Sequence, residues 1–241
     1  RSGHRKPVGI LFVDLDKFKD INDSLGHDVG DCLLKHVARL LSDSTRDTDL
    51  IARLGGDEFV ILRPGADVAQ LTALGQRLLA ASGTPLPDCD KVVHASLSIG
   101  AHVSTGGEPR RRAMHCADLA LYSAKAKGRG QVVVFTEALE SEDRRRRRVT
   151  EDVRRGLAKD LFFLEFQPIF DRRQQIAGFE ALLRLEGSDG NRISPEEFIP
   201  IAEDAGLIED LGRWVLRAAI DIACDWPPHT FVSINLSARQ F

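Results

Sequence analysis

Hydrophobic positions in the first half of the chain follow the spacing of strands and helices in turn. Val8–Asp14 is a nearly continuous apolar run, typical of a strand buried at the centre of a sheet. Between Leu33 and Leu41, apolar residues recur at the spacing of one helix face. Leu50–Leu54 and Glu58–Arg63 are strand-like, and the two glycines and the acid between them predict a hairpin.

Four further segments complete this half of the chain. Residues 68–79 have the spacing of a second helix, and the alternation over 93–101 predicts a half-buried strand. Residues 111–127 are helical in composition and end at Gly128, a suitable C′ glycine, and 131–135 form a last strand. The order β-α-β-β-α-β-α-β contains the ferredoxin-like split β-α-β arrangement, with helices covering one face of a mostly antiparallel sheet. We therefore predict an α/β (α+β, palm-like) fold.

The second half alternates strands and helices in another way. Ser194–Glu197 is a capping box with proline at the first helical position, so a helix begins there. The other predicted elements are a helix at 149–159, strands at 161–169 and 176–185, a helix at 211–222 and a strand at 230–236. This pattern predicts the opening of a (β/α)8 barrel, which needs roughly 200–250 residues when complete. We place the domains at 1–140 and 141–241 and expect the second to be only the first part of such a barrel.

Composition narrows the class of protein. Hydrophobic residues make up 43% of the 241 residues, charged residues make up 29%, and the formal net charge is −3. These values are ordinary for a soluble globular chain and exclude whole-chain disorder. No apolar stretch approaches the ~18–20 residues of a membrane helix, and no signal peptide is visible. We expect a cytoplasmic location and leave open a membrane anchor upstream in the full-length protein.

The cysteines and the basic residues suggest no special chemistry. The four cysteines form no CxxC pair, so we expect neither a zinc site nor a disulfide framework and interpret them as small buried hydrophobes. Neither half has the basic excess of a nucleic-acid-binding domain. The run Arg144–Arg148 is interpreted as a solvated helical linker, with a nucleic-acid or membrane-surface patch as the alternative.

The densest group of chemically useful residues is acidic. Asp14 and Asp16 end a buried strand and face the same way, and Asp57 and Glu58 lie at the tip of the predicted hairpin. A sheet would bring the strand end and the hairpin together, and the resulting cluster of three or four carboxylates needs a cation. Hard oxygen ligands favour Mg²⁺, often bound together with substrate phosphates. The alternative is that these are ordinary turn acids that cap a strand.

Two cations and two glycines complete the candidate site. Lys125 and Arg129 are four residues apart at a helix end, hence on one side of it. Alone they would be surface charges, whereas opposite a metal cluster they would clamp phosphates. Gly55 and Gly56 have no side chains, so a large flat ligand can approach their backbone closely.

These residues stand in a recognisable sequence. Arg53–Phe59 reads RLGGDEF, Asp14–Asp31 reads DxDxFKxxNDxxGHxxGD, and SIG and AKxxGR follow at Ser98–Gly100 and Ala124–Arg129. Over residues 8–135 the chain thus resembles the diguanylate cyclases of the GGDEF family. The family's usual N-terminal segment and its helix, some 25–30 residues, are not found before Val8, so we expect this chain to lack them.

The resemblance implies an activity and a role for each matching residue. The family condenses two GTP into cyclic di-GMP and two pyrophosphates, with one GTP in each domain of a homodimer. Asp14, the carbonyl of Leu15, and Asp57 would bind Mg²⁺ (or Mn²⁺), and Glu58 would assist the metal or the deprotonation of the attacking hydroxyl. Substrate would contact Phe18, Lys19, Lys125 and Arg129 through the triphosphate, and Asn22 and Asp31 through the guanine edge, with His27 close by.

Arg46–Asp49 matches a second motif of the family. It reads RDTD, and five residues separate it from Gly55. The resemblance implies an inhibitory RxxD site that binds the product cyclic di-GMP, since an arginine can grip phosphate or the guanine edge. The alternative is an ordinary ion pair within a loop.

The second half resembles the EAL-type cyclic di-GMP phosphodiesterases over residues 145–241. The matching segments are Gln167–Ile169, Gly178–Arg184, Ser194–Pro200 and Ile234–Ser237. The resemblance implies that Glu180 and Asn235 bind metal and that Gln167 and Arg184 lie near the bound dinucleotide. The later metal-binding acids, the catalytic lysine and the final glutamate of that family are not in this chain, so we expect an incomplete hydrolase.

Three functions remain open from the sequence. The first is a diguanylate cyclase joined to an EAL domain. The second is a phosphodiesterase whose GGDEF domain binds GTP as a regulator. The third is a receptor that binds cyclic di-GMP without turnover. None of them involves a nucleic-acid partner.

Overall fold

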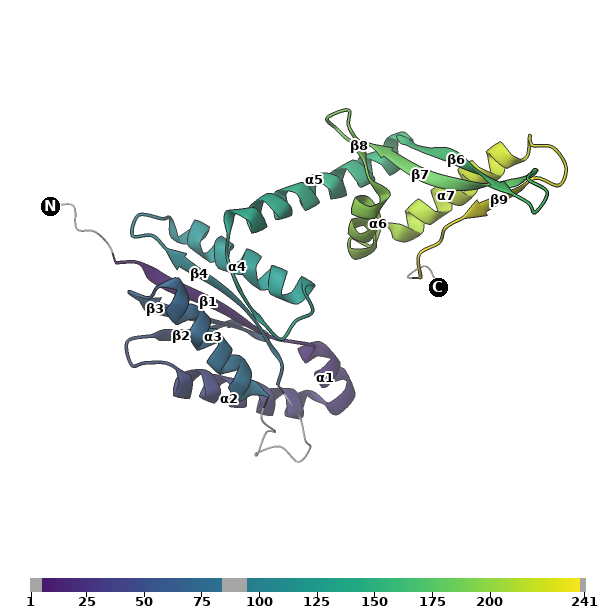
Figure 1. Ribbon diagram of the computed structural model, residues 1–241. Helices are drawn as coiled ribbons and strands as arrows, with labels where there is room; N and C mark the ends of the chain where they lie inside the picture. Colours follow the sequence, from purple (N-terminus) through teal and green to yellow (C-terminus); the bar gives the residue numbers. More distant parts are fainter. Residues whose placement is uncertain (1–5, 84–94, 239–241) are drawn as a thin grey trace. The chain divides into compact units, whose positions relative to one another are not determined.

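In the computed structural model, which describes residues 6–83 and 95–238, the strands of the first 141 residues form one sheet (Figure 1). Its order is β2-β3-β1-β4-β5, with β4 and β5 parallel and the other neighbours antiparallel. The strands are β1 (Val8–Leu15), β2 (Leu50–Gly55), β3 (Glu58–Pro64), β4 (Leu97–Ser104) and β5 (Val132–Val134), and the helices are α1 (Phe18–Leu25), α2 (His27–Ser44), α3 (Val68–Ser82) and α4 (Arg110–Ala126).

Helices cover both faces of this sheet, so the expectation that they cover one face is wrong. Along β1, Leu11 and Val13 face a core that includes α2 and α3. Ile10 and Phe12 point the other way and pack against the first turns of α4. Successive side chains of a strand point to opposite faces, and β1 is apolar at both sets of positions. The predicted palm-like α/β fold is confirmed.

Two segments of the first unit differ from the prediction. The strand expected from Val93 begins at Leu97, and residues 93 and 94 lie outside the described residues. The segment after Asp16 forms two helices, α1 and α2, which meet at Gly26 with a φ of +94°. Glycine adopts this left-handed conformation without the cost that a side chain would bring. Gly128, after α4, has a φ of +109°, as expected of a C′ glycine.

Helix α4 lies directly against the backbone of β4. A Cβ atom placed on Gly100 would be 2.2 Å from the carbonyl oxygen of Ala117 and 2.2 Å from the backbone nitrogen of Leu121. Real Cβ atoms do not approach backbone this closely, so only glycine permits the packing. Gly100 therefore fixes the height of α4 above the sheet.

A buried ion pair fastens the loop between α2 and β2 to β3. Arg63 donates two hydrogen bonds to Oδ2 of Asp49, from Nε at 3.0 Å and from Nη2 at 2.5 Å, and the side chains are only 6% and 1% exposed. The backbone N–H of Arg46 donates to the same oxygen. Burial by itself would raise the pKa of Asp49, but the hydrogen bonds from Arg63 and Arg46 outweigh it and hold this pKa below its usual value.

The second unit, residues 142–241, contains an open four-stranded sheet. β6 pairs antiparallel with β7, β7 pairs antiparallel with β8, and β9 lies parallel to β7 after a crossover through two helices. Over the described residues the strands close no barrel. The elements are α5 (Glu137–Lys159), which begins in the first unit, β6 (Phe162–Phe170), β7 (Ile176–Glu186), β8 (Arg192–Ile193), α6 (Pro195–Asp204), α7 (Ile208–Ala223) and β9 (Phe231–Ile234).

The charged and capping residues of this unit differ in part from expectation. Helix α6 begins after Ser194, with Pro195 at its first position, but the Ser194 side chain makes no capping hydrogen bond. The run Arg144–Arg148 is helical, within α5. Three of its five arginines form ion pairs rather than being only solvated: Arg145 with Glu197, Arg146 with Asp204, and Arg147 with Asp143.

The interpretation of the four cysteines as small buried hydrophobes is wrong for two of them. Cys32 is disulfide-bonded and Cys224 is exposed, whereas Cys116 is free and buried. Cys89 lies outside the described residues. Among the helices that the structure describes, none combines the length and the apolar character needed to cross a membrane.

Gly100→Ala tests the contact between α4 and β4. The added methyl group meets helix backbone, which cannot move aside as a side chain would, so we expect the unfolding midpoint of the first unit to fall by at least about 5 °C. Thermal unfolding followed by circular dichroism measures this. Gly107→Ala is the matched control, because the described structure has no atom within 4 Å of its added Cβ. Equal midpoints for the two variants would contradict the assignment.

Asp49→Asn tests the buried ion pair. Removing one partner leaves the Arg63 charge without its counter-ion, and we expect about 3 kcal/mol less free energy of unfolding at pH 7. Because the folded state lowers the pKa of Asp49, this difference is complete above the ordinary aspartate pKa of about 4 and disappears as the pH falls through the lowered value. Urea unfolding at pH 7 and at decreasing pH measures it, with the exposed Asp47→Asn as control. A difference that grew on acidification would refute the prediction.

Candidate functional sites

Acidic residues gather where β1 ends. Asp14 lies opposite Glu58 of β3 and opposite Ser98 of β4 in the strand register. Directly opposed residues of antiparallel strands share a face, so Asp14 and Glu58 both lie on the α4 side of the sheet. The backbone N–H of Leu15 donates to the carbonyl of Asp57 at 3.3 Å. The hairpin tip is thus bonded to the end of β1.

Asp14 is buried in this corner and faces one cation. Its side chain is 5% exposed, and Oδ2 lies 2.7 Å from Nζ of Lys125. Burial raises the pKa of Asp14, Lys125 offsets part of that rise, and the nearby carboxylates of Asp57 and Glu58 add to it. The three carboxylates carry more negative charge than Lys125 can neutralise. This donor set fits a divalent cation with oxygen ligands, and Asp14, Asp57 and the carbonyl of Leu15 are the groups that could hold it.

Asp16, which the sequence grouped with these acids, is occupied by structural hydrogen bonds. It accepts from Oγ of Ser96 and Oγ of Ser98, both at 2.6 Å, and from the backbone N–H of Gly130 at 3.2 Å. Both of its oxygens therefore have protein donors. Asp16 joins the end of β1 to the start of β4 and to the turn after α4. The acidic cluster therefore consists of Asp14, Asp57 and Glu58, without Asp16.

Lys125 and Arg129 lie at the same end of the sheet but contact different acids. Nε of Arg129 is 3.9 Å from Asp16, and about half of the Arg129 side chain is exposed. Arg129 also lines a hollow of about 520 Å³ together with Asp20 and Lys17, a residue that the sequence reasoning missed. Lys17 precedes α1 in a left-handed conformation, with a φ of +57°. Basic side chains next to the first turn of a helix suit a bound phosphate.

The start of α1 and the start of α2 enclose an unsatisfied acceptor. Oδ1 of Asn22 is buried and has no hydrogen-bond partner among the described residues. A Cβ on Gly30 would lie 1.9 Å from it, so the absence of a side chain there leaves room for Asn22. The ring of Phe18 would lie 3.3 Å from the same Cβ. A buried acceptor without a donor fits a ligand that brings its own N–H group, such as the edge of a purine.

Nearby positions on α2 and β2 line a second hollow. Asp31 is exposed and borders a hollow of about 550 Å³ together with Ile51 and Arg53. His27 and Lys19 are exposed at the starts of α2 and α1. The structure thus brings the positions expected to bind guanine and triphosphate to one end of the first unit.

A clamp holds the turn between β2 and β3. Nε and Nη2 of Arg53 donate to the carbonyl of Gly56 at 2.8 and 2.6 Å. Gly56 has a φ of +50°, and no described atom lies within 4 Å of a Cβ placed on either Gly55 or Gly56. The surface over the two glycines is therefore open. The sequence reasoning missed the role of Arg53, although its place two residues before the glycines was visible.

Arg46 and Asp49 do not present a joint binding surface. Arg46 is exposed, whereas the carboxylate of Asp49 turns inward to Arg63. The geometry agrees with the alternative of a loop ion pair, with Arg63 rather than Arg46 as the partner side chain. The inhibitory role of Arg46 and Asp49 stays a prediction.

In the second unit, the residues singled out by sequence gather on β7 and its neighbours. Gln167 of β6 is opposite Glu180 of β7 in the register. Nδ2 of Asn235, just after β9, donates to Oε1 of Glu180 at 2.6 Å. Arg184 lies four residues along β7, where it donates to Glu165 at 2.7 Å, and it borders a hollow of about 300 Å³ together with Asn235. A carboxylate beside an amide oxygen provides the kind of ligands that hard cations take.

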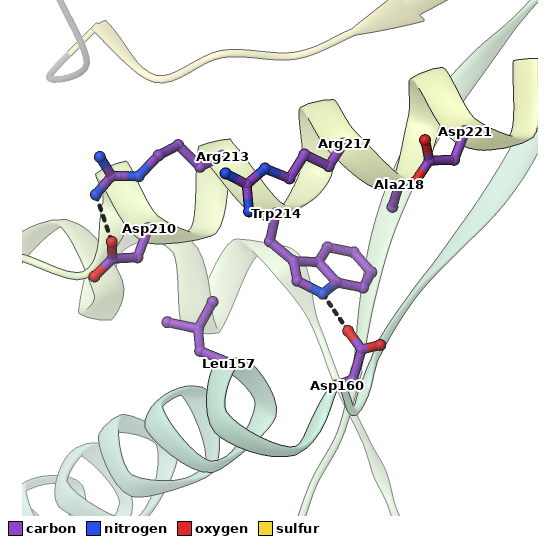
Figure 2. Close-up of a pocket in the computed structure, with 8 residues that line it drawn as sticks. All are labelled: Leu157, Asp160, Asp210, Arg213, Trp214, Arg217, Ala218 and Asp221. Carbon is purple, nitrogen blue, oxygen red and sulfur yellow. Dashed lines mark hydrogen bonds and ion pairs between the residues drawn. The ribbon is translucent and has the colours of Figure 1, made fainter.

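None of these residues lines a second, larger hollow in this unit. Figure 2 shows it between the end of α5 and α7, with a volume of about 550 Å³. The Trp214 indole N–H donates to Asp160, and Arg213 pairs with Asp210 on the same helix. These four side chains are thus paired with one another, while Arg217 and Asp221 also line the hollow.

Comparisons with known proteins agree with this geometry. Residues 1–131 match the family "Diguanylate cyclase, GGDEF domain", and residues 150–241 match the EAL domain. The GGDEF domain of TpbB (YfiN) from Pseudomonas aeruginosa is 34% identical, with a TM-score of 0.54 over 58% of this chain and 83% of that chain.

Longer relatives contain both regions. The chain is 36% identical to the bifunctional diguanylate cyclase/cyclic di-GMP phosphodiesterase MucR of Pseudomonas aeruginosa, covering 96% of this chain and 35% of MucR. It is 33% identical to the cyclic di-GMP phosphodiesterase PdeR of Escherichia coli, covering 97% of this chain and 36% of PdeR. The chain thus spans little more than a third of the length of these relatives. It belongs to the GGDEF diguanylate cyclase domain family and carries, in tandem, a region that matches the EAL domain.

Proposed function

We propose that the first unit is a diguanylate cyclase domain, which condenses two GTP into cyclic di-GMP and two pyrophosphates. The observation that carries this proposal is the buried corner of Asp14, with Asp57 and Glu58 beside it and Lys125 against it. It stands next to an intact GGDEF signature and to hollows at the positions expected to take triphosphate and base.

Each group in this corner has a task in the proposed reaction. Asp14, Asp57 and the carbonyl of Leu15 hold Mg²⁺ (or Mn²⁺), which when bound stabilises the negative charge that develops on the transferring phosphoryl group. Lys125 now neutralises Asp14. With Asp14 engaged by a metal, Lys125 would be free to contact the phosphates, which Arg129 would also bind. Glu58 assists the metal or accepts the proton of the attacking hydroxyl.

Recognition of the base rests on the first two helices. Asn22 and Asp31 accept hydrogen bonds from the guanine edge, with His27 close by, while Phe18 and Lys19 hold the triphosphate end. Gly55 and Gly56 let the ligand approach the backbone of the turn. Because the product has two phosphodiester bonds and each domain holds one GTP, we propose a homodimer. Each 3′-hydroxyl then attacks the α-phosphate bound by the other copy, and each attack releases one pyrophosphate.

We propose two further roles in cyclic di-GMP turnover. Arg46 binds product at the loop that Asp49 and Arg63 hold in place, which gives product inhibition. In the complete protein the EAL domain hydrolyses or binds cyclic di-GMP, with metal at Glu180 and Asn235 and with Gln167 and Arg184 near the dinucleotide. The domain boundary is placed near residue 141.

One observation favours a second candidate function. PdeR, which matches both parts of the chain, is named a phosphodiesterase, whereas MucR is named bifunctional. The alternative is therefore a phosphodiesterase whose GGDEF domain binds GTP as a regulator. A receptor that binds cyclic di-GMP without turnover is the third possibility.

Asp57→Asn tests the cyclase directly. Nucleotide-free full-length protein is incubated with GTP and Mg²⁺, and the products are separated by chromatography. We expect cyclic di-GMP from the wild type and at least about 100-fold less from the variant, since a carboxylate ligand to the metal is lost. Asp118→Asn, an exposed acid on α4, is the control. Unchanged GTP, with added cyclic di-GMP converted to the linear dinucleotide, would instead support the regulatory alternative.

Arg46→Ala tests product inhibition. The side chain is exposed, so stability should not change, while the concentration of cyclic di-GMP that halves the initial rate should rise about 10-fold or more as a charged hydrogen bond is lost. Rates of pyrophosphate release at increasing added product measure this. Arg111→Ala, exposed on α4, serves as control. Equal inhibition of the Arg46 and Arg111 variants would remove Arg46 from the inhibitory site.

A further inference from the structure

Three side chains of metal-ligating type meet at the other end of α4. His102 lies on β4, Glu108 lies in the loop after it, and Cys116 lies on the second turn of α4. Their ligand atoms all lie within 4.8 Å of one another. His102 is four residues along β4 from Ser98, the strand neighbour of Asp14, which is about 13 Å at 3.3 Å per residue. This group is therefore separate from the acidic corner.

The distances fit a tetrahedral ion after small movements. Nε2 of His102 is 2.8 Å from Oε2 of Glu108, and Sγ of Cys116 is 4.0 Å from Oε1 of Glu108. With Zn–N and Zn–O near 2.1 Å and Zn–S near 2.3 Å, tetrahedral ligands stand about 3.3–3.7 Å apart. The distance from His102 to Glu108 is shorter than this range, and the distance from Cys116 to Glu108 is longer. The two distances go to different oxygens of Glu108, so metal binding would require this carboxylate to turn and present one oxygen to the ion.

The surroundings hold these ligands in place. The ring of Phe135 meets the His102 ring edge to face at 5.2 Å, which limits its rotation. Cys116 precedes Ala117, whose carbonyl oxygen would lie 2.2 Å from a Cβ placed on Gly100. Because Gly100 lets helix and strand backbones meet, the spacing between His102 and Cys116 is set by backbone rather than by flexible side chains. Such support from neighbouring groups is a feature of metal sites.

Charge also balances at this place. A divalent ion with one carboxylate and one thiolate is neutral, and imidazole adds no charge. Arg112, which faces Cys116, is already paired with Glu140 and so adds no net charge. Cys116 is 1% exposed, and burial raises the pKa of its thiol, which argues against a nucleophile. The His102 and Glu108 side chains are 12% and 14% exposed, so water can reach the fourth position.

We propose that His102, Glu108 and Cys116 form a Zn²⁺ site that fastens the start of α4 to β4. Nitrogen and sulfur ligands favour Zn²⁺ over Mg²⁺. On binding, the Cys116 thiol proton leaves to solvent, and His102 carries its remaining proton on Nδ1 so that Nε2 can bind the ion. The oxidation state of every group is unchanged. The fourth ligand is water.

The test is metal binding by the full chain in millimolar Mg²⁺, which occupies sites made of hard oxygen ligands. Chelator-treated protein is titrated with Zn²⁺ against a chromophoric chelator, and with Co²⁺ to observe thiolate-to-metal charge-transfer absorption. We expect one Zn²⁺ per chain, a Co²⁺ charge-transfer band, and a rise in the unfolding midpoint on adding Zn²⁺. Cys116→Ala should lose the band and at least about 100-fold in affinity.

Controls separate this site from other metal binding. Cys224→Ser removes the exposed free thiol of the second unit and should keep both the band and the affinity. His102→Gln gives a second reading if Cys116→Ala does not fold, and it should also abolish the rise in the midpoint. Lack of Zn²⁺ uptake by the wild type at micromolar concentration would overturn the proposal. So would equal affinity in the wild type and the Cys116 and His102 variants.

Discussion

The contact between Gly100 and the backbone of α4 determines most of the chemistry described for the first unit. It brings α4 so close to the sheet that the two ends of the helix contribute side chains to two separate groups, one at the end of β1 and one on β4. At the C-terminal end, Lys125 reaches the buried carboxylate of Asp14. At the N-terminal end, Cys116 comes within ligand distance of Glu108 and His102. A longer side chain at position 100 would lift the helix and loosen both groups together, although they share no residue.

Local sequence patterns predicted the structural features that depend on residues close together in the chain. The apolar run of β1 and the glycine hairpin were enough to place Asp14 beside Glu58, because strand register follows from the pattern and the turn. The helix end at Gly128 was visible for the same reason. The apolar residues of β1 occupy both odd and even positions, which indicates that helices pack on both faces of the sheet. The ferredoxin-like order of elements instead predicted helices on one face only.

Contacts between distant residues were not predictable in this way. Asp16 is satisfied by Ser96, Ser98 and Gly130, which are 80, 82 and 114 residues away. The expectation of no zinc site rested on the lack of short cysteine and histidine spacings, whereas His102, Glu108 and Cys116 come together through a strand, a loop and a helix. Asp49 shows the opposite case. Its motif suggested ligand binding, but its partner Arg63 comes from the neighbouring strand and gives it a role in folding.

The three hydrogen bonds of Asp16 also bear on the entropy of binding. Gly130 is held by Asp16, and the preceding residue, Arg129, adopts a left-handed backbone with a φ of +64°. Ordering one residue costs about 1–2 kcal/mol in conformational entropy, and in this turn that ordering is achieved during folding. An anion that reaches Arg129 therefore meets a backbone that is already fixed and has only a side chain left to order. Asp16 thus orders the backbone around Arg129 before an anion binds, although its own contact with the Arg129 side chain is as long as 3.9 Å.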